Sequence, residues 1–316
     1  MLSRRLLRVK VMQMVYAYYK NGDTTIQRTE KELFNSISKS YELYHILLLL
    51  LVEIRNQEEK TIDVRKLKRI PTKEDLNPNK KFIDNKFFNS IGRNKQFLKF
   101  IDSKKISWSE EQEFVRKILN QIKETALYKD YMATQDSNDE LDRKFICKLT
   151  EKVIAPIEEL YNYFEEKSIY WNDEVEFVIS MVIKTIKEYD LQMDQEQELL
   201  PEFKDEDDKM FVKTLFRNSI LNEYNYRKLI DQYTKNWDIE RVAFIDIVLM
   251  QIALAEITEF SNIPVKVTLN EYIELAKHYS TSKSGVFING VLDKIVEHLK
   301  KENKVVKSGK GLMDIN

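Results

Sequence analysis

The chain has 316 residues, of which 43% are hydrophobic, and this is enough for a packed core and excludes a disordered chain. Its six glycines and five prolines are far below the usual usage of about 7% and 5%, which favours long helices over sheets with many turns. The net charge of −1 indicates no particular partner. Cys147 is the only cysteine, the start lacks the apolar region of a signal peptide, and the longest aliphatic run, Ile46 to Val52, has seven residues, whereas a bilayer span needs about 20. The sequence therefore predicts a cytoplasmic protein without a membrane segment or an internal disulfide.

Charge is distributed unevenly along the chain. Between Lys60 and Lys105 there are 14 lysines and arginines against 5 acidic residues. Between Glu188 and Asp208 there are 10 acidic residues against one lysine, and the last 23 residues hold six lysines against three acids. The first ten residues are also basic. Basic segments of this kind can contact phosphates although the whole chain is neutral.

The N-terminal half begins with a predicted helix over residues 3–20, ended by Asn21-Gly-Asp23. A second helix is predicted over about 26–60. The basic insert, residues 61–105, carries Pro71 and Pro78 and is interpreted as a linker or an inserted element. Its phenylalanines alternate with lysines, which fits either packing or a second RNA surface, and the acidic stretch 188–208 could instead neutralise it. Helical patterning resumes at Ser109.

Two segments resemble each other at an offset of 66 residues. The first member of each matching pair lies between residues 139 and 190, and the second lies 66 positions later. The matches are Asp139, Glu140, Asp142, Phe145, Leu149 and Trp171 with Asp205, Glu206, Asp208, Phe211, Leu215 and Trp237. Six identities indicate either an internal duplication or two amphipathic helices that share a packing pattern.

The C-terminal half contains the most apolar predicted helix, over 244–255, in which only Asp246 and Gln251 are polar. Such a helix is typical of the centre of a bundle. Thr268-Leu-Asn-Glu271 has the spacing of a capping box and predicts a helix that starts there and runs to His278. A last helix is predicted over about 286–300, with a buried stripe formed by Ile288, Val291, Leu292, Ile295 and Leu299.

The segment from Ile263 to Ser280, followed by Ser284-Gly-Val-Phe-Ile-Asn-Gly-Val-Leu-Asp293, resembles the C-terminal signature of the NusB family. The basic start, Arg4-Arg-x-x-Arg8 followed by Gln13 and Tyr16, resembles the arginine-rich first helix of that family. The resemblance covers about 1–20 and 205–302. Gln251 and Ile247 depart from it, since the family often has an arginine and a polar residue at these positions.

The resemblance implies an all-α fold, a helical bundle of NusB type with additional helices inserted in an extended N-terminal half. We expect three parts: an elaborated N-terminal part over 1–204, a NusB-like bundle over 205–302, and a basic flexible tail over 303–316. The resemblance also implies binding of a boxA-like single-stranded sequence in the ribosomal RNA leader. This binding would occur together with NusE, a small-subunit ribosomal protein, within the antitermination complex of RNA polymerase.

The first predicted helix places arginines and tyrosines on one face, and this combination suits phosphates and unpaired bases. On the last helix, Phe287 lies away from the predicted stripe, beside Lys294, and is a candidate stacking platform. The resulting RNA-binding candidates are Arg4, Arg5, Arg8, Tyr16, Lys283, Phe287, Asn289 and Lys294. By the resemblance Asp246 is a candidate contact to NusE. Without the resemblance, packing explains the tyrosines of the first helix better than RNA binding does. It explains Phe287 equally well, and a position at a helix start explains Asp246 at least as well as a contact does.

Catalysis has little support in the sequence. The three histidines are far apart, and no glycine-rich phosphate loop, zinc motif or cysteine pair is present, so we expect no catalytic residue, metal or cofactor. Two alternatives to antitermination remain at this stage. One is a protein-only helical scaffold, and the other is the RNA-binding part of a ribosomal RNA modification system, which we expect to continue into an α/β domain that this sequence lacks.

Overall fold

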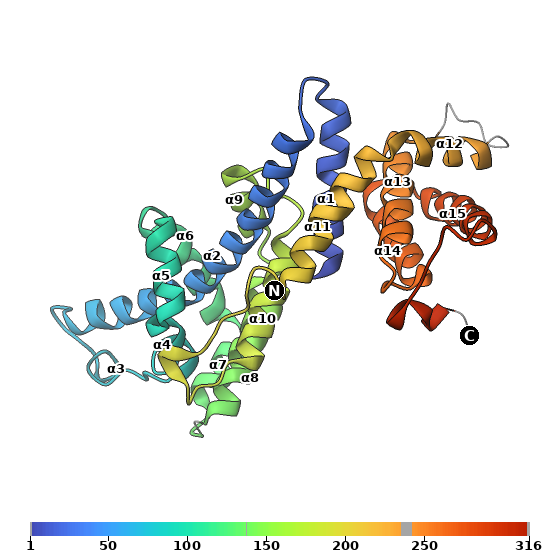
Figure 1. Ribbon diagram of the computed structural model, residues 1–316. Helices are drawn as coiled ribbons and strands as arrows, with labels where there is room; N and C mark the ends of the chain where they lie inside the picture. Colours follow the sequence, from blue (N-terminus) through green and yellow to red (C-terminus); the bar gives the residue numbers. More distant parts are fainter. Residues whose placement is uncertain (1, 137, 235–241, 315–316) are drawn as a thin grey trace. The chain divides into compact units, whose positions relative to one another are not determined.

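The structure, a computed structural model, describes residues 2–136, 138–234 and 242–314. All regular secondary structure in these residues is helical, so the predicted all-α fold is confirmed (Figure 1). None of the described helices is both long and apolar enough to cross a membrane. The contacts divide the described chain into two compact units, one of residues 38–202 and one that joins 2–37 to the residues from 203 onward. Each unit is described by itself below.

Unit 2, as we call residues 2–37 with 203–316, is a helical bundle whose central helix is buried on nearly every side. Its helices are α1 (Arg4–Lys20), the start of α2 (Ile26–Lys66), α11 (Glu206–Leu221), α12 (Glu223–Thr234), α13 (Phe244–Glu259), α14 (Val265–Tyr279) and α15 (Ser284–Lys301). All residues of α13 from Val248 to Ile257 are buried. The prediction that this helix forms the centre of a bundle is therefore confirmed.

The start of α14 corrects one prediction. The helix begins at Val265 after Pro264, one turn before the predicted capping box. Thr268 is inside the helix and fully buried, and its hydroxyl donates to the Glu256 carboxylate at 2.8 Å instead of accepting from a backbone N–H at the helix start. A buried carboxylate needs hydrogen-bond donors, and this need, not capping, accounts for the threonine.

Unit 1, residues 38–202, is built around the rest of α2. Its other helices are α3 (Lys73–Leu76), α4 (Lys86–Arg93), α5 (Lys95–Lys104), α6 (Gln112–Glu124), α7 (Ala126–Ala133), α8 (Asp139–Leu149), α9 (Glu158–Lys167) and α10 (Val175–Glu188), with a π-helical segment, η2 (Thr150–Ile154), and two short 3₁₀ helices, η1 (Ser109–Glu111) and η3 (Asp194–Glu196). The aliphatic run Ile46–Val52 lies in α2, within the helix that the sequence predicted over about 26–60.

The basic insert is part of the core of unit 1 and is not a linker. The rings of Phe82, Phe87, Phe88 and Phe97 are each 1% exposed, so they pack and cannot stack on RNA. Several of its lysines have intramolecular partners. Lys86 pairs with Asp139 at 2.7 Å, Lys81 donates to the carbonyl oxygens of Thr134 and Asp136, and Lys95 pairs with Glu196 in the acidic stretch.

The tail after α15 is also tied down. Lys307 Nζ donates to the carbonyl oxygens of Ile257 and Phe260 at 2.9 Å each, at the end of α13. Gly311 lies so close to Ser261 that a Cβ there would be 2.0 Å from the Ser261 carbonyl oxygen. Residues 303–313 therefore do not form the free tail that the lysine content suggested.

The described parts of the 66-residue pattern lie in corresponding places of two helices. Asp142 and Asp208 follow the N-caps of α8 and α11, and both are buried, at 3% and 4% exposure. Asp142 accepts from the Tyr131 hydroxyl at 2.8 Å, and Asp208 accepts from Arg4 at 2.7 Å. Trp237 lies outside the described residues, and the internal duplication stays a prediction.

The first helix belongs to a different part of the fold than the sequence suggested. The sequence placed the first helix with an N-terminal part over 1–204, whereas the structure joins it to the C-terminal bundle. The reason is that α1 packs on α11 and α13, through ion pairs with residues more than 200 positions away.

Candidate nucleic-acid interface

The N-terminal arginines lie at the start of α1, the helix end where the dipole disfavours cations. Ser3 caps α1 by accepting a hydrogen bond from the Leu6 amide, so Arg4 and Arg5 occupy the first turn, beside the positive end of the helix dipole. Carboxylates offset this. Arg4 pairs with Asp208 at 2.7 Å, and Arg5 makes two hydrogen bonds to Glu271, at 2.8 and 2.9 Å. The hydrogen bond with Arg5 lowers the pKa of Glu271.

Arg8 does not belong to the RNA site that the sequence suggested, because it is only 3% exposed. Its guanidinium makes two hydrogen bonds of 2.7 Å to Glu256, whose carboxylate also accepts from Thr268 and Tyr272. Burial lowers the pKa of Arg8, but the hydrogen bonds and charge of Glu256 outweigh burial, and the pKa is raised overall. A charge held in this way stabilises the bundle and is not accessible to a phosphate. We therefore remove Arg8 from the candidate contacts.

The opposite end of α1 carries the exposed aromatic group that the sequence placed on this helix. Tyr16 is 37% exposed and packs edge-on against Phe244, with 5.4 Å between ring centroids. Lys20 Nζ lies 4.7 Å from the Phe244 centroid and 5.7 Å from the Tyr16 centroid. Arg227 of α12 lies over the rings of Tyr19 and Phe244, at 5.2 and 5.6 Å. We call Tyr16, Tyr19, Lys20, Arg227 and Phe244 the cationic aromatic cluster.

A hydrogen bond links the start of α15 to the start of α13, the end of α13 that carries Phe244. Asp246, two residues after Phe244, accepts a hydrogen bond of 2.7 Å from the Ser284 hydroxyl. Lys283, the residue before Ser284, is exposed. Asp246 itself is 3% exposed, so it organises two helix starts and does not present a surface to NusE in this structure. Because a contact needs an accessible side chain, this burial corrects the expectation that Asp246 contacts NusE. Its second oxygen has no hydrogen-bond partner among the described residues.

Phe287 is likewise not the exposed stacking platform that the sequence suggested. It is 7% exposed, because α15 contacts α12, α13 and α14 and therefore buries a wider arc than one stripe. The predicted stripe is itself confirmed as buried, and the exposed apolar position of this turn is Val286, at 79%. Asn289 is half-buried and Lys294 is exposed, one and two turns further along the helix.

One of the two α13 residues that depart from the NusB pattern, Gln251, has a clear structural role. Gln251 is fully buried, and its amide donates to the Tyr19 hydroxyl at 2.6 Å and to the Ser219 carbonyl at 2.5 Å. Burial raises the pKa of Tyr19 to about 12, so this hydroxyl is neutral at physiological pH. An uncharged glutamine here positions Tyr19 in the cluster, without adding a cation of its own.

The predicted site residues are therefore separated along the bundle. Tyr16 and Lys283 lie near the end of α1 and the start of α13, where the cationic aromatic cluster is, whereas Arg4 and Arg5 lie at the start of α1. Between the two ends, Arg8 and Met12 share the face of Tyr16 but are covered. Sequence reasoning missed Lys20, Arg227 and Phe244. Lys20 follows Tyr16 by four residues, a spacing that places both on one helix face and could have been used.

The described residues contain no group of three or more histidine, cysteine or acidic side chains that could hold a metal ion. Together, the helical bundle and its exposed cations beside aromatic rings define an all-helical protein with a surface suited to anionic, ring-bearing ligands.

Comparisons with known proteins give the family. A model of the NusB family matches residues 175–297. Over 106 residues the chain is 38% identical to the transcription antitermination protein NusB of Salinibacter ruber, covering 34% of this chain and 66% of that protein. The same-named protein of Chloroherpeton thalassium is 40% identical over 107 residues, covering 34% and 51%. That of Desulfatibacillum aliphaticivorans is 39% identical over 97 residues, covering 31% and 68%.

The chain belongs to the NusB family. It spans between about half and about two thirds of the lengths of these relatives. Among solved structures, NusB of T. maritima matches 50% of this chain and 94% of its own, at 23% identity and a TM-score of 0.30, too weak a likeness to support conclusions about the site.

Proposed function

We propose that this chain is an RNA-binding transcription antitermination factor. With NusE, it binds a boxA-type sequence in nascent ribosomal RNA and suppresses premature termination by RNA polymerase. Family membership supports this proposal, and so does the printed name of its relatives, transcription antitermination protein NusB.

The observation that carries the RNA part is the cationic aromatic cluster. Its exposed members, Tyr16 and Lys20, offer a ring and a cation side by side, and exposed Lys283 lies next to the linked start of α15. Rings stack on unpaired bases and cations neutralise phosphates, so the cluster suits a single strand. Arg4, Arg5, Asn289 and Lys294 remain secondary candidates, because Arg4 and Arg5 would first have to exchange their carboxylate partners for phosphate.

The function is tested by titrating a labelled boxA-like RNA with the full chain, with and without NusE, and measuring fluorescence anisotropy. We expect binding that weakens as salt increases, and tighter binding when NusE is present. A scrambled RNA of equal length should bind more weakly. Equal affinity for both RNAs, or no binding, would instead support the protein-only scaffold.

The site is tested by Tyr16→Ala, which should weaken RNA binding by about 1–3 kcal/mol if the ring stacks on a base. Lys209→Gln is a control for charge changes on the bundle, because Lys209 lies on α11 close to Asp208 and Arg4, away from the cluster. Circular dichroism and the melting temperature establish that both variants are folded. A Tyr16→Ala protein that is folded and binds normally would remove the cluster from the RNA site.

A further inference from the structure

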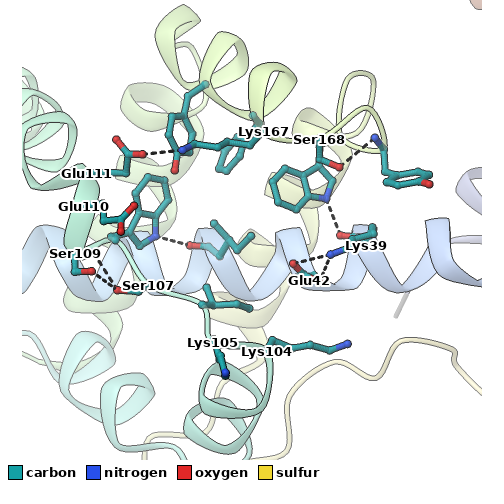
Figure 2. A pocket seen from close by; sticks show the side chains of 17 residues that line it. Lys39, Glu42, Lys104, Lys105, Ser107, Ser109, Glu110, Glu111, Lys167 and Ser168 are labelled. Carbon is teal, nitrogen blue, oxygen red and sulfur yellow. Dashed lines mark hydrogen bonds and ion pairs between the residues drawn. The ribbon is translucent and has the colours of Figure 1, made fainter.

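Unit 1 contains a pocket of about 560 Å³ that the proposed function does not use. Its floor is one face of α2, formed by Lys39, Glu42 and Ile46. One side is formed by Lys104 and Lys105 at the end of α5. The other is formed by Ser109–Glu111, just before α6, with the end of α9 and the residues that follow it (Figure 2). All of these residues belong to unit 1, so the pocket lies within one compact body.

Two tryptophans are fixed at the pocket by hydrogen bonds to the floor helix. The Trp108 indole N–H donates to the Ile46 carbonyl at 3.2 Å, and the Trp171 indole N–H donates to the Lys39 carbonyl at 2.8 Å. Trp108 stacks on Tyr163, with 5.2 Å between centroids, and Tyr163 is only half-buried. The aromatic walls are therefore held in place before any ligand arrives.

The charged side chains of the pocket are divided between its two sides. Figure 2 shows Lys104 and Lys105 on one side, and Glu110, Glu111 and Lys167 on the other. Lys167 pairs with Glu111 at 2.9 Å. In the part of the chain that the structure describes, no carboxylate pairs with Lys104 or Lys105, and both are exposed. This lysine pair thus offers two uncompensated cations at one edge.

Lys105 also has an unusual backbone conformation. Lys105 ends α5 in the left-handed conformation, with φ 55° and ψ 41°. Glycine is the usual residue at such a helix end, because a side chain there is strained. A lysine at this position places a cation at the pocket edge at a cost to stability, which is a common property of binding residues.

From this arrangement we infer that the pocket binds a nucleoside phosphate, either free or as a nucleotide within single-stranded RNA. The phosphate lies at the Lys104–Lys105 edge, and the base lies against the aromatic wall beside Tyr163, whose ring is itself covered by Trp108 and by Lys167 Nζ, 5.2 Å from its centroid. Glu110, whose carboxylate is exposed on the opposite side, can accept hydrogen bonds from the N–H groups of a base. This site is in a different unit from the cationic aromatic cluster and does not depend on it.

The carboxylates decide against an acidic peptide. Glu42 and Glu111 line the pocket paired with Lys39 and Lys167, but Glu110 has no such partner among the described residues and would repel a peptide carboxylate. A nucleoside phosphate carries its anion at one end and hydrogen-bond donors at the other, which matches the two sides. A second depression of about 420 Å³ shares Ile106, Ser107, Trp108 and Ser109 with the pocket and continues to Lys60. An adjacent nucleotide of an RNA strand could occupy it.

The test uses tryptophan emission. The chain has three tryptophans, and in a Trp237→Phe protein the remaining two both line the pocket. This protein is titrated with the four nucleoside monophosphates, short oligouridine, inorganic phosphate and polyglutamate, and the signal is corrected with N-acetyltryptophanamide. We expect a saturable change with a nucleotide or with the RNA. Free nucleotides that bind as tightly as the RNA identify a free ligand, and binding of the RNA alone identifies a strand.

Lys104→Gln with Lys105→Gln should weaken this binding about tenfold or more, since hydrogen bonds to charged groups are involved. Lys99→Gln, on an exposed lysine of α5 outside the pocket, is the matched control and should bind as the parent does. Lys105→Gly should weaken binding while raising the melting temperature, which a purely structural lysine would not do. The inference is overturned if no nucleotide or RNA gives a saturable change, if phosphate alone or polyglutamate binds equally well, or if the double variant binds normally.

Discussion

The two units place their cations in opposite ways. In unit 2, the arginines that the sequence marked as the RNA surface bind carboxylates of the same bundle, and Arg8 is buried against Glu256. In unit 1, half of the lysines of the basic insert are bonded within the described part of the fold, and Lys104 and Lys105 are among those that are not. A charge count therefore locates basic segments, whereas the carboxylates available to each cation decide which of them can contact a phosphate.

The largest expected effect is on the buried pair of unit 2. Arg8→Ala should lower the free energy of unfolding by about 3–5 kcal/mol, because it leaves the Glu256 carboxylate buried without its cation. Arg5→Ala breaks an exposed pair and should cost only about 0–1 kcal/mol. Denaturant unfolding of both variants measures the contrast. If the two losses were equal, the assignment of Arg8 to the fold would be wrong.

The second effect concerns a buried histidine of unit 1. His45 is fully buried and stacks on Phe100, and burial lowers its pKa from 6.5 to about 4. As pH falls, the unfolded chain therefore takes up a proton on His45 near pH 6.5, whereas the folded chain takes it up only near pH 4. Stability should fall across this window as pH decreases, by up to about 3 kcal/mol. His45→Phe should lose less stability between pH 7 and pH 4, and equal losses in urea unfolding would contradict the burial argument.

A third effect tests the tail of unit 2. Gly311→Ala would place a Cβ 2.0 Å from the Ser261 carbonyl oxygen, so the tail has to move and lose the Lys307 hydrogen bonds. We expect a cost of about 1–3 kcal/mol, typical of an overpacked contact. Gly290→Ala, where a Cβ would meet nothing within 4 Å, is the control. Faster proteolysis of the tail in the first variant alone would support the account, and identical melting temperatures would not.

The smallest effect is a gain. Lys105→Gly should stabilise unit 1 by about 1 kcal/mol, because glycine accepts the left-handed conformation without strain. Thermal unfolding measures it, with Lys99→Gly, in the interior of α5, as a control that should destabilise by about 1 kcal/mol. A loss of stability at position 105 would mean that the side chain holds the turn in place.

Sequence reasoning identified what depends on local periodicity. The stripe of α15, the apolar character of α13 and the start and end of α1 all follow from residues within a few turns of each other. It failed where the deciding partner is distant. Arg8 is buried by Glu256, 248 positions away, and Phe287 by helices that no local pattern reveals. The pocket of unit 1 combines segments near residues 39–46, 104–111 and 163–171, and their proximity exists only in the fold.

The most direct test of the account compares the salt dependence of affinity for a boxA-like RNA in two double variants. Lys20→Gln with Lys283→Gln removes cations at the cluster end of unit 2, and Arg4→Gln with Arg5→Gln removes the paired arginines at the other end. Each lost phosphate contact lowers the slope of log affinity against log salt by about 0.7 on a single strand. We expect a slope lower by up to about 1.4 in the lysine variant and a smaller change in the arginine variant. The reverse order, in folded proteins, would contradict the placement of the RNA at the cationic aromatic cluster.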